Sequence, residues 1–313
     1  MGLMRQTQWT ASRASSTLSD RTPLDQRLAS GETLVADGAI GTLLFERGLD
    51  PGACPESVTL SHPEVLEEIA RLYLEAGADI IGTNTFGGSP LKLAAYGLAD
   101  STDEINARAV TAVRKAVGDR AYVAGSVGPC GKLLTPYGDA KPEDVYGSFR
   151  RQVESLVEAG VDCIFVETMI DLTEAKLAVR AVKDVSAATP VTASMTFDAT
   201  PNGFFTIMGV SVEAAAAGLT EVGADAIGSN CGNGIENMVQ IARAFRNVSQ
   251  LPLTIQPNAG LPHIANGKAV YDETPAFMAE QAKALVSLGV SVIGGCCGTT
   301  PEHIAALRAI VDE

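Results

Sequence analysis

Eight short apolar runs alternate along the chain with longer segments of helical period. The runs are 33–36, 79–83, 121–126, 162–167, 191–196, 225–230, 253–256 and 291–294. Strands that alternate with helices in this way are typical of parallel βα units. Eight units predict an α/β fold of the (β/α)8 TIM-barrel type, and the 313 residues of the chain suffice for one such barrel.

The segments between the strands carry apolar residues at every third or fourth position, as in 145–156 and 175–185. A weak internal repeat supports the same architecture, because a glycine follows the helical segment before four of the strands. These glycines are Gly77, Gly160, Gly223 and Gly289. Ser61 and Thr300 stand shortly before prolines and are expected to begin helices as N-caps.

The first thirty residues differ from the rest of the chain. They are rich in Ser, Thr, Arg and Gln, and they show neither an apolar period nor a hydrophobic leader segment. We expect residues 1–30 to form a loose N-terminal arm, which Trp9 could dock onto the body or a neighbouring subunit. Residues 31–313 are expected to form a single barrel domain.

Charge and cysteine content narrow the range of partners. The net charge is −14 and the lysines and arginines are scattered, so no basic surface is expected for nucleic acid. No apolar run is long enough to cross a membrane. The six cysteines lack regular spacing, which is typical of a reducing compartment. We therefore expect a cytoplasmic protein without nucleic-acid or membrane partners.

Cysteines lie at the ends of two predicted strands. In TIM barrels the functional groups lie at the carboxyl ends of the strands. Cys296 and Cys297 follow the eighth strand and Cys231 follows the sixth. Adjacent cysteines rarely bond to each other, because the ring they would close is strained, whereas zinc commonly binds several thiolates. The alternative is that the pair belongs to the buried core. We assign no ligand role to Cys54, Cys130 and Cys163.

With these residues assembled, the chain resembles the homocysteine S-methyltransferase family, and most closely the homocysteine-binding module of cobalamin-dependent methionine synthase. The resemblance runs from about Thr33 to the C-terminus and implies a (β/α)8 barrel. Seven motifs carry it in order, namely Asp-Gly-Ala-Ile-Gly-Thr at 37–42, Gly-Ala-Asp-Ile-Ile-Gly-Thr-Asn-Thr-Phe at 77–86, Gly-Ser-Val-Gly-Pro at 125–129, Val-Glu-Thr at 166–168, Asn-Cys at 230–231, Pro-Asn-Ala-Gly-Leu-Pro at 257–262 and Gly-Gly-Cys-Cys-Gly-Thr-Thr-Pro at 294–301.

The resemblance implies a zinc site. Its ligands would be Cys231, Cys296 and Cys297, with Asn258 as the candidate fourth ligand before substrate arrives. Coordination to zinc deprotonates a thiol that is otherwise mostly protonated at neutral pH. The expected nucleophile is therefore the substrate thiolate, and no cysteine of the protein acts as one.

The resemblance also implies a site for the amino-acid end of homocysteine. Asp37 and Glu167 would bind its amino group, and backbone amides near Gly38 and Ala39 would receive its carboxylate. The structural alternatives are a turn cap for Asp37 and an interior ion pair for Glu167. The expected activity is transfer of a methyl group to zinc-bound homocysteine, which forms methionine and belongs to methionine biosynthesis.

Two departures from the family pattern bear on the methyl donor. Gly82 stands where methionine-synthase modules often carry an acidic residue, and we expect no folate-binding or cobalamin-binding module after Glu313. We therefore expect a small donor or methylcobalamin carried by a separate corrinoid protein. Two alternatives remain open: a corrinoid-coupled methyltransferase that uses another thiol or donor, and a non-catalytic module that binds homocysteine or zinc.

Overall fold

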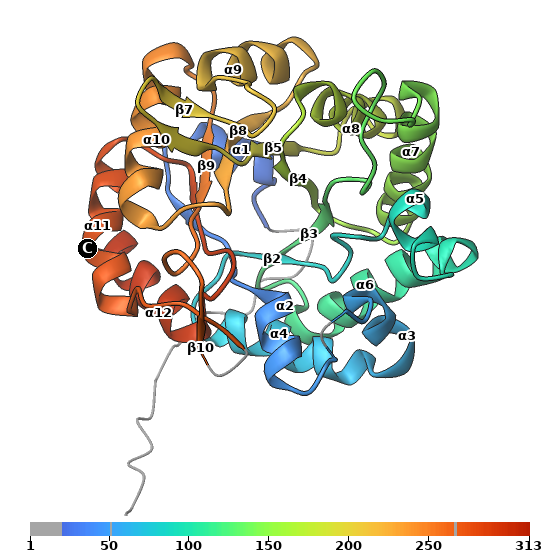
Figure 1. The fold of residues 1–313 in the computed structure, drawn as a ribbon. Coiled ribbons are helices and arrows are strands. Elements are labelled where there is room, and N and C mark those ends of the chain that lie inside the picture. The colour runs from blue at the N-terminus through green and yellow to red at the C-terminus, as the bar shows by residue number, and fades with distance from the viewer. Residues whose placement is uncertain (1–20, 51, 266–267) are drawn as a thin grey trace, which may run out of the picture.

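A computed structural model describes residues 21–50, 52–265 and 268–313, in which eight parallel strands lie inside a ring of helices (Figure 1). The strands are β1 (Leu34–Val35), β2 (Ile80–Gly82), β3 (Tyr122–Val127), β4 (Cys163–Met169), β5 (Val191–Met195), β8 (Ala226–Asn230), β9 (Leu253–Gln256) and β12 (Val292–Ile293). They pair in the order β1-β12-β9-β8-β5-β4-β3-β2. A parallel bridge between Ala36 and Ile80 joins the two ends of this order. The predicted (β/α)8 barrel is confirmed.

Helices occupy the segments predicted between the strands, and further helices precede the first strand and follow the last. They are α1 (Leu24–Ala29), α2 (Ile40–Glu46), α3 (Val58–Ser61), α4 (Pro63–Glu75), α5 (Pro90–Ala94), α6 (Thr102–Val117), α7 (Pro142–Glu158), α8 (Leu172–Val185), α9 (Val212–Glu221), α10 (Ile235–Val248), α11 (Pro275–Ser287) and α12 (Pro301–Val311), with 3-10 turns at Pro55–Ser57 and Ala99–Ser101. Within the described residues, no helix has the length and apolar character needed to cross a bilayer.

Two small hairpins lengthen the loops that follow β5 and β9. The first pairs β6 (Asp198–Thr200) with β7 (Gly203–Phe205), and the second pairs β10 (His263–Ala265) with β11 (Lys268–Val270). Both belong to βα connections, which start at the carboxyl ends of the barrel strands. They therefore add surface beside the mouth of the barrel.

Most of the helix-capping residues predicted from the sequence cap helices in the structure. The four repeated glycines adopt positive φ angles of 65–95°, which suits a left-handed C-cap. Thr300 begins α12 in a capping box with His303. The helix start predicted at Ser61 is wrong: Ser61 ends α3, and α4 begins at Pro63 after His62. The reason is that the residues before α4 already form a helical turn, which removes the extended geometry of an N-cap.

The loose arm expected over residues 1–30 is wrong for residues 21–30. Leu24 and Leu28, on one face of α1, are buried in a cluster with barrel-interior residues such as Phe165. Arg21 donates to the Ala121 carbonyl at 2.6 Å and forms an ion pair with Asp162. The segment packs under the amino-terminal end of the barrel, and its six-residue helix is too short to show a period in the sequence. Trp9 lies outside the described residues.

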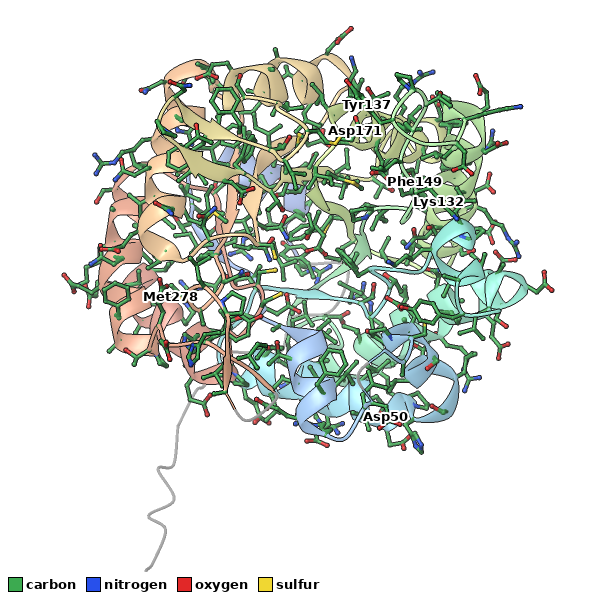
Figure 2. All side chains as sticks on the ribbon, viewed as in Figure 1. Asp50, Lys132, Tyr137, Phe149, Asp171 and Met278 are labelled. Carbon is green, nitrogen blue, oxygen red and sulfur yellow. The ribbon has the colours of Figure 1, made fainter. Side chains whose placement is uncertain are left out.

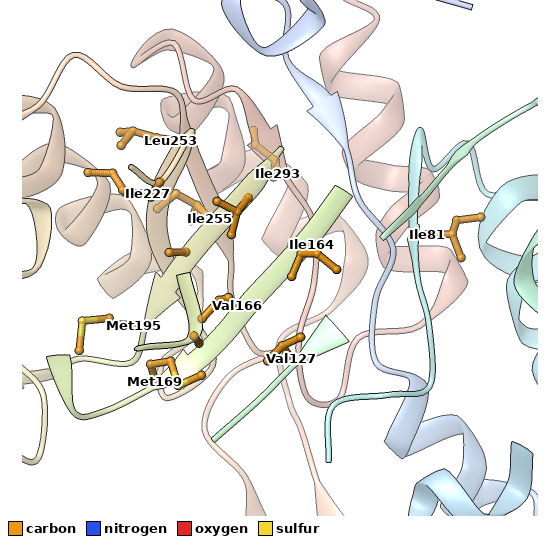
Figure 3. Close-up of a cluster of buried hydrophobic side chains, with 14 of the residues drawn as sticks. Ile81, Val127, Ile164, Val166, Met169, Met195, Ile227, Leu253, Ile255 and Ile293 are labelled. Carbon is orange, nitrogen blue, oxygen red and sulfur yellow. The ribbon is translucent and has the colours of Figure 1, made fainter. Parts of the chain in front are cut away.

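Side chains alternate along the strands between two apolar layers. Ile80 and Ala124 belong to the interior layer, whereas Ile81 belongs to the larger layer between strands and helices. Figure 3 shows part of this outer layer, with branched side chains on several neighbouring strands. Side chains also fill the space between the ribbons (Figure 2). The packed interior leaves the strand ends and their loops to carry polar groups.

Candidate functional site

Three free thiols meet at the carboxyl ends of β8 and β12. The Sγ atoms of Cys231, Cys296 and Cys297 all lie within 4.8 Å of one another, and those of Cys231 and Cys297 are 3.9 Å apart. Tetrahedral zinc with bonds of about 2.3 Å to sulfur holds its sulfurs roughly 3.8 Å apart. Across the described ranges, no other group of His, Cys, Asp or Glu has metal-ligand geometry.

Backbone hydrogen bonds between neighbouring loops hold the thiols in place. Cys231 has a left-handed backbone with φ of 60°, and its amide donates to Gln256 at 3.1 Å. The Cys296 amide donates to the Pro257 carbonyl at 2.8 Å. A positive φ outside glycine costs about 1–3 kcal/mol, and such residues cluster at functional sites. The loops after β8, β9 and β12 therefore act as one support for the sulfur atoms.

Hydrogen bonding within the cluster makes the three thiols differ in acidity. Hydrogen bonds from Cys296 and Cys297 to the Cys231 sulfur lower the pKa of Cys231 to about 3. The donated protons raise the pKa of Cys297 to about 11 and that of Cys296 further. A metal that takes all three as thiolates must displace the two remaining protons.

The side chain of Asn258 supplies a fourth polar group. It is buried, a hydrogen bond from it helps to lower the pKa of Cys231, and its Oδ1 has no hydrogen-bond partner among the described residues. An unsatisfied buried acceptor costs about 1–3 kcal/mol, so this oxygen is available for a cation. Three sulfurs and one amide oxygen make a donor set that fits zinc.

Two carboxylates share the barrel mouth with the thiols. Asp37 is buried and accepts from the Gly82 amide at 2.9 Å, and Glu167 accepts from the Ser126 hydroxyl at 2.5 Å. Burial raises the pKa of each to about 7; the charge of Glu167 adds to the rise at Asp37, and Cys231 adds to that at Glu167. Two carboxylates that influence each other electrostatically, without a salt bridge in the described part of the chain, are suited to bind a cationic group.

The backbone amides expected to receive a carboxylate differ in availability. The Ala39 amide donates to Thr299 Oγ1 at 3.2 Å, and the same hydroxyl donates to the Cys296 carbonyl at 2.7 Å. A Cβ atom on Gly38 would lie only 2.6 Å from Thr299 Oγ1 and 2.9 Å from the Tyr73 hydroxyl. Thr299 thus joins the Asp37 loop to the thiol loop, and Gly38 remains the candidate donor.

Gly82 lies directly beside the carboxylates. A Cβ atom at this position would lie 3.5 Å from Asp37 Oδ2, at ordinary contact distance. A cavity of about 10 Å³, room for one water, lies behind it and is also lined by Tyr73 and Asn84. The acidic residue that related modules often carry here would therefore project next to Asp37.

Three further residues complete the site, namely Asn230, Ser126 and Tyr271. Asn230 donates to Glu167 Oε2 at 3.4 Å and to Cys296 Sγ at 3.8 Å. Tyr271, which follows the β10–β11 hairpin, hydrogen-bonds the Cys297 sulfur, and burial raises the pKa of Tyr271 to about 12. Asn230 and Ser126 stand at strand ends within the motifs at 230–231 and 125–129, whereas Tyr271 follows no barrel strand and carried no signal in the sequence.

The two carboxylates predict a pH-dependent stability for the metal-free protein. Their pKa of about 7 exceeds the ordinary values of 3.8 for Asp and 4.5 for Glu. Between these ordinary values and pH 7, the folded state therefore binds more protons than the unfolded state. Stability therefore falls as the pH rises through this window and stays low above it. We expect the Asp37→Asn/Glu167→Gln double variant to melt above wild type at about pH 8, with the gap closing near pH 4. Thermal scans with chelator and reductant measure this, and a gap independent of pH would contradict it.

Known proteins share this fold. A family model described as homocysteine S-methyltransferase matches residues 34–311. The chain is 34% identical to the methionine synthase of Mycobacterium leprae (strain TN) over 297 residues, which are 89% of this chain and 24% of that protein. The identity to methionine synthase of Mycobacterium tuberculosis (strain ATCC 25618 / H37Rv) is 34% over 302 residues, 90% and 25% of the two chains. The chain thus spans about a quarter of the length of these relatives.

Solved structures give the same result. The metallated form of the homocysteine methyltransferase MmuM from Escherichia coli matches with a TM-score of 0.76 at 26% identity, covering 92% of this chain and 99% of that one. The oxidized form of the same protein matches with a TM-score of 0.75 at 27% identity and the same coverage. The likeness extends over the whole barrel.

Proposed function

This chain belongs to the homocysteine S-methyltransferase family, and from that premise we propose that it is a zinc-dependent enzyme that methylates homocysteine to methionine. One observation carries the proposal: a three-thiol cluster, the buried carboxylate of Asp37 and the half-buried carboxylate of Glu167 face the same barrel mouth. The thiols suit a metal that binds a substrate sulfur, and the carboxylates suit the ammonium group of an amino acid. Homocysteine carries both groups.

Cys231, Cys296, Cys297 and Asn258 would hold the zinc. When bound, zinc would supply a Lewis acid that keeps the homocysteine sulfur deprotonated at neutral pH. The orphan Oδ1 of Asn258 is the donor that an incoming substrate sulfur could replace most readily, because a neutral amide binds more weakly than a thiolate. The metallated form of the Escherichia coli relative supports a metal in this family.

Asp37 and Glu167 would orient the substrate. An ammonium group between them favours the ionised form of each carboxyl group, which draws their pKa values back down. Hydrogen bonds from Gly82 and Ser126 hold the two carboxylates, so the amino end is bound at defined positions. The substrate sulfur is thereby directed toward the thiol cluster rather than left to diffuse in the mouth.

The methyl donor could be a small molecule or a separate corrinoid protein that carries methylcobalamin. Loops at the carboxyl ends of the strands expose large apolar side chains that a macromolecular partner could cover. These are Leu133 (48%), Tyr137 (74%), Ile207 (75%), Leu261 (66%) and Ile264 (75%). Figure 2 labels Tyr137, which lies on the loop after β3. Such a surface favours a protein donor over a small one.

Methyl-transfer assays test the proposal. The purified chain, loaded with zinc and supplied with homocysteine, is combined in turn with methylcobalamin on a corrinoid protein, free methylcobalamin, S-methylmethionine, S-adenosylmethionine and betaine. We expect methionine with at least one donor and none after zinc is removed. Homocysteine binding without product for any donor would favour the non-catalytic module, and turnover with other thiols alone would favour a different acceptor.

The proposed compartment is the cytoplasm. All six cysteines are free thiols in the structure, including the three that lie close enough to react with one another. A reducing compartment keeps such a cluster available for metal.

A further inference from the structure

The side chain of Asn230 lies between the two halves of the site. It ends β8 immediately before Cys231 and is fully buried. The Thr168 amide donates to its Oδ1 at 2.7 Å, and its Nδ2 donates to the Thr168 hydroxyl at 2.8 Å. Because a backbone N–H must face an acceptor, Thr168 determines which end of the amide is oxygen and which is nitrogen.

The second N–H of Asn230 has two acceptors. Glu167 Oε2 lies 3.4 Å from Nδ2, and Cys296 Sγ lies 3.8 Å from it. Both distances are at the long end for their type, so neither acceptor takes the hydrogen fully. One donor is thus shared by the carboxylate proposed to bind an ammonium group and by a sulfur proposed to bind zinc.

The fold maintains a strained backbone to hold this amide. Thr168 has a φ of 61°, a conformation that is rare for a β-branched residue and costs about 1–3 kcal/mol. In this conformation both its amide and its hydroxyl reach Asn230. The two hydrogen bonds prevent the Asn230 amide from rotating away from Glu167 and Cys296. The strain is located where the orientation of one N–H matters.

We propose that Asn230 is a positioning residue that couples recognition of the substrate's ammonium group to the Cys296 sulfur. The inference rests on the proposed function. An ammonium group on Glu167 compensates the carboxylate charge, so the shared N–H moves toward the Cys296 thiolate. An N–H···S bond withdraws negative charge from that thiolate, which then donates less to the metal and leaves the site more receptive to the substrate sulfur. Amino-acid thiols are thereby favoured over simple thiols.

A comparison of two thiols tests the coupling. Homocysteine and 4-mercaptobutanoate, which lacks the amino group, are titrated into cobalt-substituted wild type, Asn230→Ala and Asn230→Ser, with binding followed by the sulfur-to-cobalt absorption. Wild type should bind homocysteine more tightly than 4-mercaptobutanoate. In both variants the ratio of the two affinities should fall about tenfold, which is within the usual range of coupling between two sites. Affinity for 4-mercaptobutanoate should change little.

Asn106→Ala is the matched control. Asn106 is equally buried but donates only to the carbonyls of Gly88 and Thr102, so its loss should leave the preference unchanged. Equal loss of affinity for both thiols in the Asn230 variants would overturn the coupling and leave the proposed function standing. A wild type that does not distinguish the thiols would overturn the proposed substrate, and the coupling with it.

Discussion

Alanine at Cys231, Cys296 or Cys297 is expected to abolish stoichiometric zinc binding and to lower methyl transfer by about a thousandfold or more. Changing a residue that only supports a ligand already costs about 10–100-fold, and each of these changes removes a ligand itself. The three sulfurs lie within 4.8 Å of one another, so no other described side chain of this chemistry can replace the missing one. Zinc per chain by atomic emission and methionine formation are the measurements.

Cys163→Ala is the matched control for these changes. Cys163 is also a free thiol, but it is buried in the interior layer at the start of β4. Its replacement should lower stability slightly and leave the zinc content at one per chain. A cluster variant that keeps full zinc and full activity would remove the basis of the proposed site.

Glu167→Gln is expected to lower kcat/KM for homocysteine by about 30- to several-thousand-fold. Removing one partner of a buried charge pair costs roughly 2–5 kcal/mol, and every 1.4 kcal/mol is a factor of ten. The glutamine side chain has nearly the same shape and can still exchange a hydrogen bond with Ser126. The loss should fall on homocysteine and spare a thiol without an amino group.

Glu174→Gln serves as the control for this prediction. Glu174 is a buried glutamate whose pKa is likewise raised by burial, and it accepts from the Cys130 amide at 2.7 Å. Its neutralisation should leave the KM for homocysteine unchanged. If Glu167→Gln and Glu174→Gln reduce activity alike, the effect is structural and Glu167 does not bind the ammonium group.

Much of the fold could be predicted because each strand and each helix carries its own local signal. The strand runs coincide with the observed strands to within about two residues, since β-branched apolar residues must alternate between two buried layers. The barrel in turn placed Cys231, Glu167 and Asp37 at one end, because every parallel strand ends on the same rim. Local pattern and topology together brought the candidate ligands into one place.

The remaining features depend on contacts between distant segments. Thr299 and Thr300 are adjacent and chemically alike, yet only Thr300 caps α12, while Thr299 bonds a loop some 260 positions away in the chain. Thr299 can take this position because Gly38 has no side chain, and no local sequence pattern indicates that these two residues meet. The shared N–H of Asn230 on β8 likewise depends on the left-handed backbone of Thr168 on β4, from which β5 separates it in the sheet.

Helix α1 determines the N-terminal boundary of the barrel domain when that domain is fused to another protein. The match to the family model starts at residue 34, so a fusion junction chosen from that match alone would discard α1. Without it, the Tyr122 hydroxyl would lose its bond to Thr22, and Asp162 would keep only Arg114 as a cationic partner. The floor of the barrel would open to water beneath its apolar interior layer. A chimera that grafts this domain onto another protein should therefore keep the chain from Arg21 onward.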